Sequence, residues 1–162
     1  MRPSTVLLLV AGWLVILGPV ARAGDRTLDP KKAAEAIRKA GGYFAVDLNA
    51  PGQPVVGVFF SPNVKSDFGD KDLELLVAFP TLTILDLCKT KVTNRGLSTL
   101  QRLAGLRALG LRGTRVTDKS LRALKRMTSL RNLDLRNTKV TEAGVKDLKK
   151  TLPKLKVMKG PR

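Results

Sequence analysis

The chain contains no histidine, one cysteine and one tryptophan, and aromatic residues make up only 4% of its 162 residues. The lack of histidine excludes Ser–His–Asp triads, Cys–His pairs and histidine-ligated metal sites. A single cysteine excludes an internal disulfide, so packing alone must stabilise the fold. The second half of the chain also offers no aromatic platform on which single-stranded nucleic acid could stack.

Acidic side chains are scarce as well: the chain has 13 of them and 30 basic ones, and the formal net charge is +17. The two halves differ, because residues 24–80 carry seven basic and eight acidic side chains, whereas residues 81–162 carry 21 and five. A concentrated positive field favours anionic partners such as acidic polysaccharide, anionic lipid headgroups or nucleic acid. The alternative is that lysine and arginine simply keep a polar exterior soluble, which the spread of the charges over several faces favours.

What the second half does contain is a 24-residue repeat. Five positions recur at this spacing: Leu82, Leu106 and Leu130; Leu85, Leu109 and Leu133; Leu87, Leu111 and Leu135; Thr90, Thr114 and Thr138; Val92, Val116 and Val140. A period between about 20 and 29 with L-x-x-L-x-L is typical of leucine-rich repeats. Three copies in register make a chance match untenable.

The spacing predicts local structure. Leucines two apart, such as Leu85 and Leu87, lie on one side of a short strand. Pairs three apart, such as Leu97 and Leu100, suit one face of a short helix. Three threonines precede these helices and can cap them, namely Thr93, Thr117 and Thr141, and the hydroxyls at 90, 114 and 138 can bond to backbone in the turn. The prediction is an α/β fold: a right-handed leucine-rich-repeat solenoid with parallel strands on one face and helices on the other.

The sequence of the first half indicates an export signal followed by a segment that caps the repeats. Met1–Arg2, the apolar run Val6–Leu17 and the small-x-small sequence Ala21–Ala23 indicate a cleavable signal peptide. An uncleaved anchor is the alternative, although the run is short for a bilayer. The predicted units are a signal peptide at 1–23, an N-terminal helix–strand cap at 24–53, a degenerate first repeat at 54–80, three leucine-rich repeats at 81–153 and a partial strand at 154–162.

Within these units we expect a helix over Asp29–Ala40 that ends at a Gly-Gly pair, and strands over Tyr43–Leu48 and Val55–Phe60. In the first strand Phe44, Val46 and Leu48 occupy alternating positions. A further helix is expected over Lys71–Phe79, with Asp70 as its N-cap.

The consensus L-x-x-L-x-L-x-x-T-x-V-T-x-x-[GS]-L resembles that of exported leucine-rich-repeat proteins from planctomycete-like bacteria, and it is similar to the cysteine-containing subclass of such repeats. Gly96–Leu97, Ser120–Leu121 and Gly144–Val145 carry its last part. The resemblance implies an interaction scaffold. It does not imply the ubiquitin-ligase role of the F-box kind, since no F-box-like region is present.

We expect a partner protein on the open strand face, and the residues predicted to bind it are Asp86, Lys89, Arg112, Asp134, Arg136 and Asn137. Basic residues also stack in columns: Lys91, Arg115 and Lys139 in one, and Arg107 and Arg131 in another, with Lys156 expected next. These columns support the alternative function, a polyanion-binding module for acidic polysaccharide or an anionic surface, with nucleic acid disfavoured.

No enzyme, cofactor or metal site is predicted. Asp86 and Asp134 occupy equivalent strand positions two repeats apart, roughly 10 Å by the strand spacing. The pair flanks Arg112 and Arg136, so salt bridging on the open face is favoured over acid–base chemistry. Cys88 follows the inward Leu87, so we expect a partly exposed thiol that points away from the core and leaves an intermolecular disulfide open.

Overall fold

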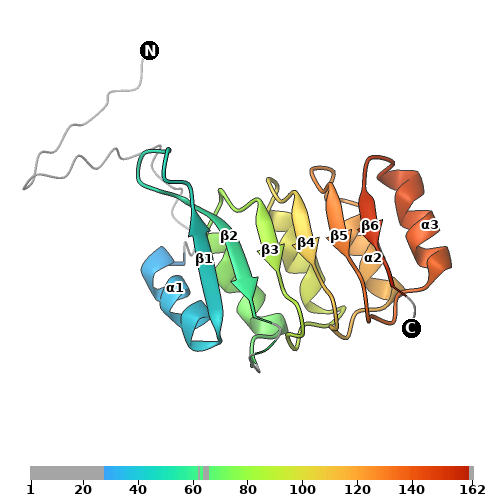
Figure 1. Ribbon diagram of the computed structural model, residues 1–162, viewed down its shortest axis with the longest axis horizontal. Coiled ribbons are helices and arrows are strands. Elements are labelled where there is room, and N and C mark those ends of the chain that lie inside the picture. Colours follow the sequence, from blue (N-terminus) through green and yellow to red (C-terminus); the bar gives the residue numbers. More distant parts are fainter. Residues whose placement is uncertain (1–27, 62, 64–65, 161–162) are drawn as a thin grey trace, which may run out of the picture.

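The computed structural model describes residues 28–61, 63 and 66–160, and the predicted signal peptide lies outside this part of the chain. Its strands form one six-stranded sheet in the order β1-β2-β3-β4-β5-β6, with helical segments behind it (Figure 1). The strands are β1 (Gly42–Val46), β2 (Val55–Phe60), β3 (Ile84–Asp86), β4 (Ala108–Gly110), β5 (Asn132–Asp134) and β6 (Lys156–Met158). The helical segments are α1 (Pro30–Lys39), η1 (Asp70–Ala78), η2 (Gly96–Arg102), α2 (Asp118–Leu124) and α3 (Glu142–Thr151).

The five strands from β2 to β6 pair in parallel, and β1 pairs antiparallel with β2. This is the predicted α/β leucine-rich-repeat architecture: parallel strands that alternate with short helices, preceded by an N-terminal helix and an antiparallel hairpin. None of the helices among the described residues has the length and apolarity that a bilayer crossing requires.

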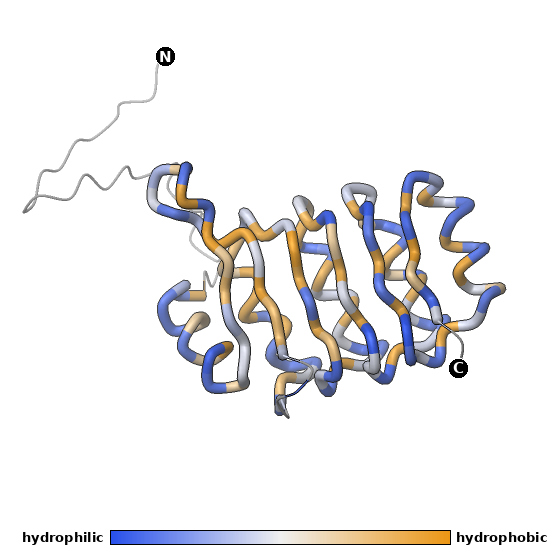
Figure 2. The backbone as a smooth tube through the Cα atoms, in the orientation of Figure 1, coloured by the Kyte–Doolittle hydropathy of each residue, from blue (hydrophilic) through white to orange (hydrophobic). Residues whose placement is uncertain are grey.

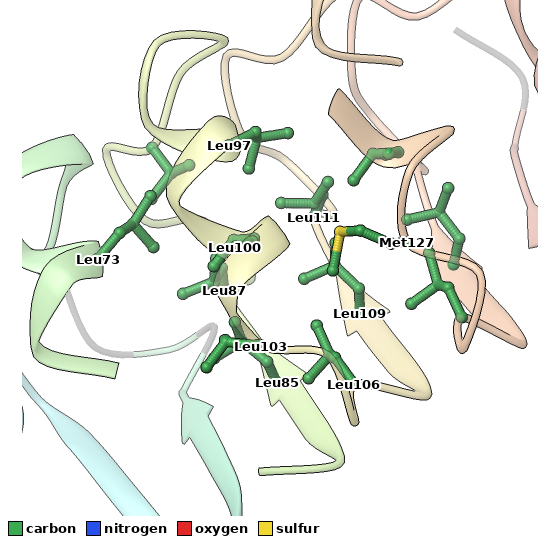
Figure 3. Packing of buried hydrophobic residues seen from close by; sticks show 14 of the residues in the cluster. Leu73, Leu85, Leu87, Leu97, Leu100, Leu103, Leu106, Leu109, Leu111 and Met127 are labelled. Carbon is green, nitrogen blue, oxygen red and sulfur yellow. The ribbon is translucent and has the colours of Figure 1, made fainter. Parts of the chain in front are cut away.

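Columns of leucine form the core, as the repeat predicts. Leu85, Leu109 and Leu133 occupy matched register positions on β3, β4 and β5, and each is almost wholly buried. Helical residues such as Leu97 and Leu100 meet them from the other side (Figure 3). Apolar and polar residues alternate along the strands and helices, as Figure 2 shows, so each turn buries its apolar side against its neighbours.

The helical segments of successive turns differ in pitch. η1 and η2 are 3-10 helices, whereas α2 and α3 are α-helical. Side chains three residues apart eclipse one another in a 3-10 helix, so Leu73 and Leu76 both reach the core, as do Leu97 and Leu100.

α1 covers the first turn of the stack. Asp29 accepts a hydrogen bond from the backbone N–H of Lys31 at 2.9 Å and so caps the helix, as predicted. Ala33 and Ile37 are its buried residues. The helix ends before Gly41, whose φ of 87° is readily adopted only by glycine.

The hairpin that follows corrects the sequence prediction in one respect. β1 ends at Val46, where the register with β2 shifts, and the chain then enters the turn. Phe44 packs against the core, but Val46 is 41% and Leu48 72% exposed. The strand predicted over Tyr43–Leu48 therefore ends earlier, at Val46, because its pairing with β2 becomes irregular there.

Threonine hydroxyls close each strand-exit turn. Thr90, Thr114 and Thr138 donate to the carbonyl oxygens three residues earlier, at 2.7, 2.6 and 2.7 Å. Thr90 and Thr114 are buried, so these bonds give their hydroxyl groups a partner inside the protein.

A second polar ladder joins successive repeats, and its members are also 24 residues apart. Asp70 accepts hydrogen bonds from the backbone N–H and hydroxyl of Thr93. Asn94 accepts a hydrogen bond from the backbone N–H of Thr117 at 2.8 Å, and its side-chain amide donates to the Thr117 hydroxyl at 2.9 Å. Asp118 accepts from both groups of Thr141, as Asp70 does from Thr93, at 2.8 and 2.7 Å. We call these contacts the inter-repeat clamp.

The clamp explains two features of the sequence. Asp70 does not cap η1 as predicted, because its carboxylate is turned toward Thr93 and the N-cap position is Gly69. Its neighbour in the next turn must also be small, since a Cβ at Gly96 would lie 2.6 Å from an Asp70 carboxylate oxygen. A Cβ at Gly144 would collide with Asp118 in the same way.

We expect Asn94→Ala to lower the free energy of unfolding by about 1–3 kcal/mol, because it leaves the partly buried N–H of Thr117 without its acceptor. Urea unfolding measures the change. Asn132→Ala is the matched control, since Asn132 is exposed and the described structure gives its side chain no hydrogen bond. Equal losses in the two variants would contradict a stabilising role for the clamp.

Candidate functional site

Strand register places two rows of side chains on the side of the sheet away from the helices. Together they form the surface that we call the open face. One row consists of Tyr43, Phe59, Asp86, Gly110, Asp134 and Met158, and the other of Ala45, Gly57, Ile84, Ala108, Asn132 and Lys156. Residues between the rows, such as Leu85, point into the core. The rows run across the strands of Figure 1 from β1 to β6.

Apolar side chains gather at the β1 end of this face. Tyr43 stacks on Phe59 with 5.4 Å between ring centroids, and Tyr43 is 54% exposed. Ile84 beside them is 41% exposed. A shallow hollow of about 190 Å³ extends from Phe59 and Ile84 across Gly110 to Met158. Exposed apolar residues that cluster around a hollow are typical of a binding surface.

Asp86 lies on the floor of the hollow. Its carboxylate extends over Gly110, where any Cβ would collide with it. It accepts a hydrogen bond from the backbone N–H of Cys88 at 3.0 Å. Burial raises the pKa of Asp86 and the charge of Asp134 adds to the rise, against the opposing effects of that hydrogen bond and of Arg112. Asp86 forms no salt bridge with any described residue.

Asp134 occupies the matching position two strands away and behaves differently. The guanidinium of Arg136 binds it, with Nη2 at 2.6 Å from one carboxylate oxygen and Nε at 3.0 Å from the other. Burial alone would raise the pKa of Asp134, but the hydrogen bonds and charge of Arg136 outweigh it and lower the pKa. The expected salt bridging thus occurs at Asp134 and not at Asp86.

Cys88 corrects another prediction. The residue is only 6% exposed and therefore buried, not partly exposed. Burial raises the pKa of its thiol, and the charge of Asp86 adds to the effect. The repeat positions that match Cys88 hold the long side chains of Arg112 and Arg136, which reach solvent where a short thiol does not. Burial also disfavours the intermolecular disulfide.

Lys89 and Asn137, both predicted to bind the partner, lie beside the open face in the strand-exit turns. Their φ angles are 55° and 54°, and Gly113 at the matching position has 69°. Glycine and asparagine tolerate this left-handed conformation best. The backbone N–H groups of Lys89 and Gly113 donate to the next repeat at 2.8 and 2.9 Å, so these turns are also structural.

The two basic columns lie at opposite edges of the sheet. Lys91, Arg115 and Lys139 follow the strand-exit turns, and Lys91 is paired with Asp67 at 2.5 Å. Arg107 and Arg131 precede β4 and β5. Lys156 does not continue their column as expected, because it pairs in register with Asn132 on the open face.

Among the residues predicted to bind a partner, the structure therefore brings Asp86, Asp134, Arg112 and Arg136 into one electrostatic neighbourhood. It adds Tyr43, Phe59 and Met158, which sequence reasoning missed. The 24-residue spacing from Asp134 to Met158 could have revealed the last of these. The described residues contain no group of three or more His, Cys, Asp or Glu side chains that could hold a metal ion.

Comparison with known proteins agrees with this architecture. Residues 80–140 match the sequence model of the leucine-rich repeat family. A search of curated proteins found no match. This match identifies leucine-rich repeats within residues 80–140 of the chain.

Three solved structures illustrate the likeness, which concerns the fold alone. A leucine-rich-repeat protein of Leptospira interrogans has 18% identity and a TM-score of 0.43 over 52% of this chain and 21% of its own. An internalin of Listeria monocytogenes has 16% identity and a TM-score of 0.40 over 56% and 32%. The leucine-rich-repeat ectodomain of the receptor kinase SOBIR1 from Arabidopsis thaliana has 15% identity and a TM-score of 0.41 over 80% and 90%. The match thus spans less than half of either bacterial protein.

The raised pKa of Cys88 lowers the fraction of reactive thiolate at neutral pH, and burial blocks access to it. We expect the native thiol to be alkylated about tenfold or more slowly than the same thiol in denaturant. Iodoacetamide labelling followed by mass spectrometry measures both rates. Equal rates would show that the thiol is exposed in the native protein.

Asp86→Asn should raise the free energy of unfolding at pH 7 by up to about 1 kcal/mol, a small effect because the carboxyl keeps part of its solvent. The native pKa is raised, so ionised Asp86 opposes folding above that pKa, and the cost disappears as the pH falls through it. The asparagine oxygen can still accept the Cys88 hydrogen bond.

Asp134→Asn is the control with the opposite sign. The lowered native pKa of Asp134 means that its ionised form stabilises the fold at neutral pH, and this stability is lost as the pH falls through that pKa. Urea unfolding of both variants and the parent at neutral and acidic pH measures the effects. A loss of stability in both variants at pH 7 would contradict the difference between the two carboxyls.

Proposed function

We propose that this protein is a non-catalytic, protein-binding scaffold that acts in the exported compartment and seats its partner on the open face. A leucine-rich-repeat fold is consistent with protein binding in general. The export prediction depends on residues 1–23, outside the described part of the chain, and localisation of a tagged full-length chain would test it.

The observation that carries the proposal is the environment of Asp86. A half-buried carboxylate with a raised pKa lies on the floor of a hollow, and no cation within the described chain is bound to it. Holding a charge there costs stability, and such groups are concentrated at functional sites. A partner that places a positive group beside Asp86 would offset the loss of stability.

The surrounding surface defines what else the partner must bring. Tyr43, Phe59 and Ile84 offer exposed apolar area at one end, and Arg136, already paired with Asp134, lies at the other. Aromatic side chains supply much of the energy of protein interfaces. The partner is therefore a protein segment with apolar side chains that pack near β1 and β2 and with a lysine or arginine that reaches Asp86.

Selection of peptides from a displayed random library against the purified chain tests this proposal. We expect enriched peptides to combine apolar residues with a lysine or arginine. Ile84→Glu should weaken their binding at least about tenfold, because it places a charge in the apolar contact. Lys146→Glu, a change at an exposed position of α3 on the far side of the sheet, is the control and should leave binding unchanged.

Asp86→Asn separates the charge from the apolar contact. Binding of peptides that carry a basic residue should fall, while binding of peptides in which that residue is replaced by glutamine should not. Selected peptides that bind equally well to the Ile84→Glu and Lys146→Glu variants would place the binding surface elsewhere and overturn the proposal.

A further inference from the structure

A second surface lies at the edge of the sheet where the helices lead back into the strands. Parallel strands place all their starting ends at one edge. Three segments stack there, each made of a turn before a strand and, in two of them, the end of the preceding helix: residues 102–107, 126–131 and 150–154. These segments contain no acidic residue. Their basic residues form what we call the basic edge: Arg102, Arg107, Arg126, Arg131, Lys150 and Lys154.

Neighbouring carboxylates do not neutralise the basic edge. Arg102 has an ion pair, with Glu74 at 2.8 Å, and the other five members have none within the described part of the chain. The strand-exit edge differs, because Asp67 pairs with Lys91 there and Glu142 pairs with Lys159 at 2.6 Å. Most of the positive charge of the basic edge is thus not compensated by an ion pair within the described residues.

One place on this edge is shaped to hold an anion. Arg107, Ser129 and Arg131 line an open hollow of about 300 Å³. Arg131 Nη1 donates to the carbonyl oxygens of Thr128 and Leu130, at 2.7 and 2.9 Å, which orients the guanidinium. Its other N–H groups and the Ser129 hydroxyl remain as donors, and arginine suits planar anions such as carboxylates.

The shape and composition of the edge narrow the ligand class. The large apolar residues of these turns, such as Leu106 and Met127, are buried, and the exposed positions between them are small or polar, such as Ala104 and Thr128. Bases therefore have no aromatic surface on which to stack. None of these segments exposes a large hydrophobic side chain, so a bilayer has only small apolar residues such as Ala104 and Pro153 to contact there. A linear, hydrophilic polyanion that lies along the stacked segments needs neither an aromatic surface nor an exposed apolar one.

From these observations we propose that the basic edge binds an acidic polysaccharide, with one of its carboxylate or sulfate groups in the hollow between Arg107 and Arg131. The arginines pair with the anion and the Ser129 hydroxyl donates to it. This surface lies apart from the open face, so it adds a ligand to the protein-binding function and does not depend on it.

Titration of the purified chain with heparin and with polygalacturonate, at about 0.1 M salt to screen distant charges, tests the proposal. Both polymers should bind. The double variant Arg107→Gln/Arg131→Gln should lose about tenfold or more in affinity, because each arginine contributes charge-assisted hydrogen bonds. Arg115→Gln/Lys139→Gln removes the same charge from exposed positions at the opposite edge, and it should cost under about twofold.

Ser129→Ala provides a test at unchanged net charge, and it should also weaken binding. Equal losses in the two double variants, with no effect of Ser129→Ala, would show that only net charge matters and would overturn the site. Anionic vesicles and duplex DNA complete the comparison, since tighter binding to either would overturn the ligand class. Urea unfolding confirms that each variant remains folded.

Discussion

Each turn of this protein is too small to bury its own apolar side, so the structure depends on stacking at a fixed period. Leucine columns supply the apolar contact between turns. The inter-repeat clamp supplies the polar counterpart, because Asn94 of one turn satisfies a backbone N–H and a hydroxyl of the next. The clamp also fixes the register between turns, since its two groups must meet the same threonine. This register also sets which outward side chains of successive turns lie next to one another on each surface.

Because stacking uses only the inward positions and the clamp, the outward positions can carry different chemistry on each side. The open face combines aromatic residues with a half-buried carboxyl group, that of Asp86. The strand-exit turns are constrained by left-handed residues such as Asn137, and they contain compensating carboxylates. The basic edge carries arginines of which only Arg102 has an ion pair within the described residues. The two ligands proposed above, a basic protein segment and an acidic polysaccharide, would therefore occupy separate surfaces.

The open face also shows how a break in the period can create a site. Asp86 and Asp134 match in register, but Gly110 separates them where an aspartate would continue the column. The missing side chain lets the Asp86 carboxylate lie flat, and burial then raises its pKa. Two aspartates at equivalent positions of one repeat thus acquire opposite pKa shifts, because only Asp134 has Arg136 beside it.

The sequence by itself determined the fold: the leucine columns, the threonine ladder and the capped helix α1 all follow from spacing and from local hydrogen bonding. The residues of the inter-repeat clamp are also visible in the sequence, because Asp70, Asn94 and Asp118 are 24 residues apart. Only the tertiary structure decided that Asp70 bonds across the repeat, that Cys88 is buried and that Lys156 faces the open side. Burial and pairing at those positions depend on the size and charge of side chains brought in from neighbouring turns, and no periodicity within one strand or helix encodes them.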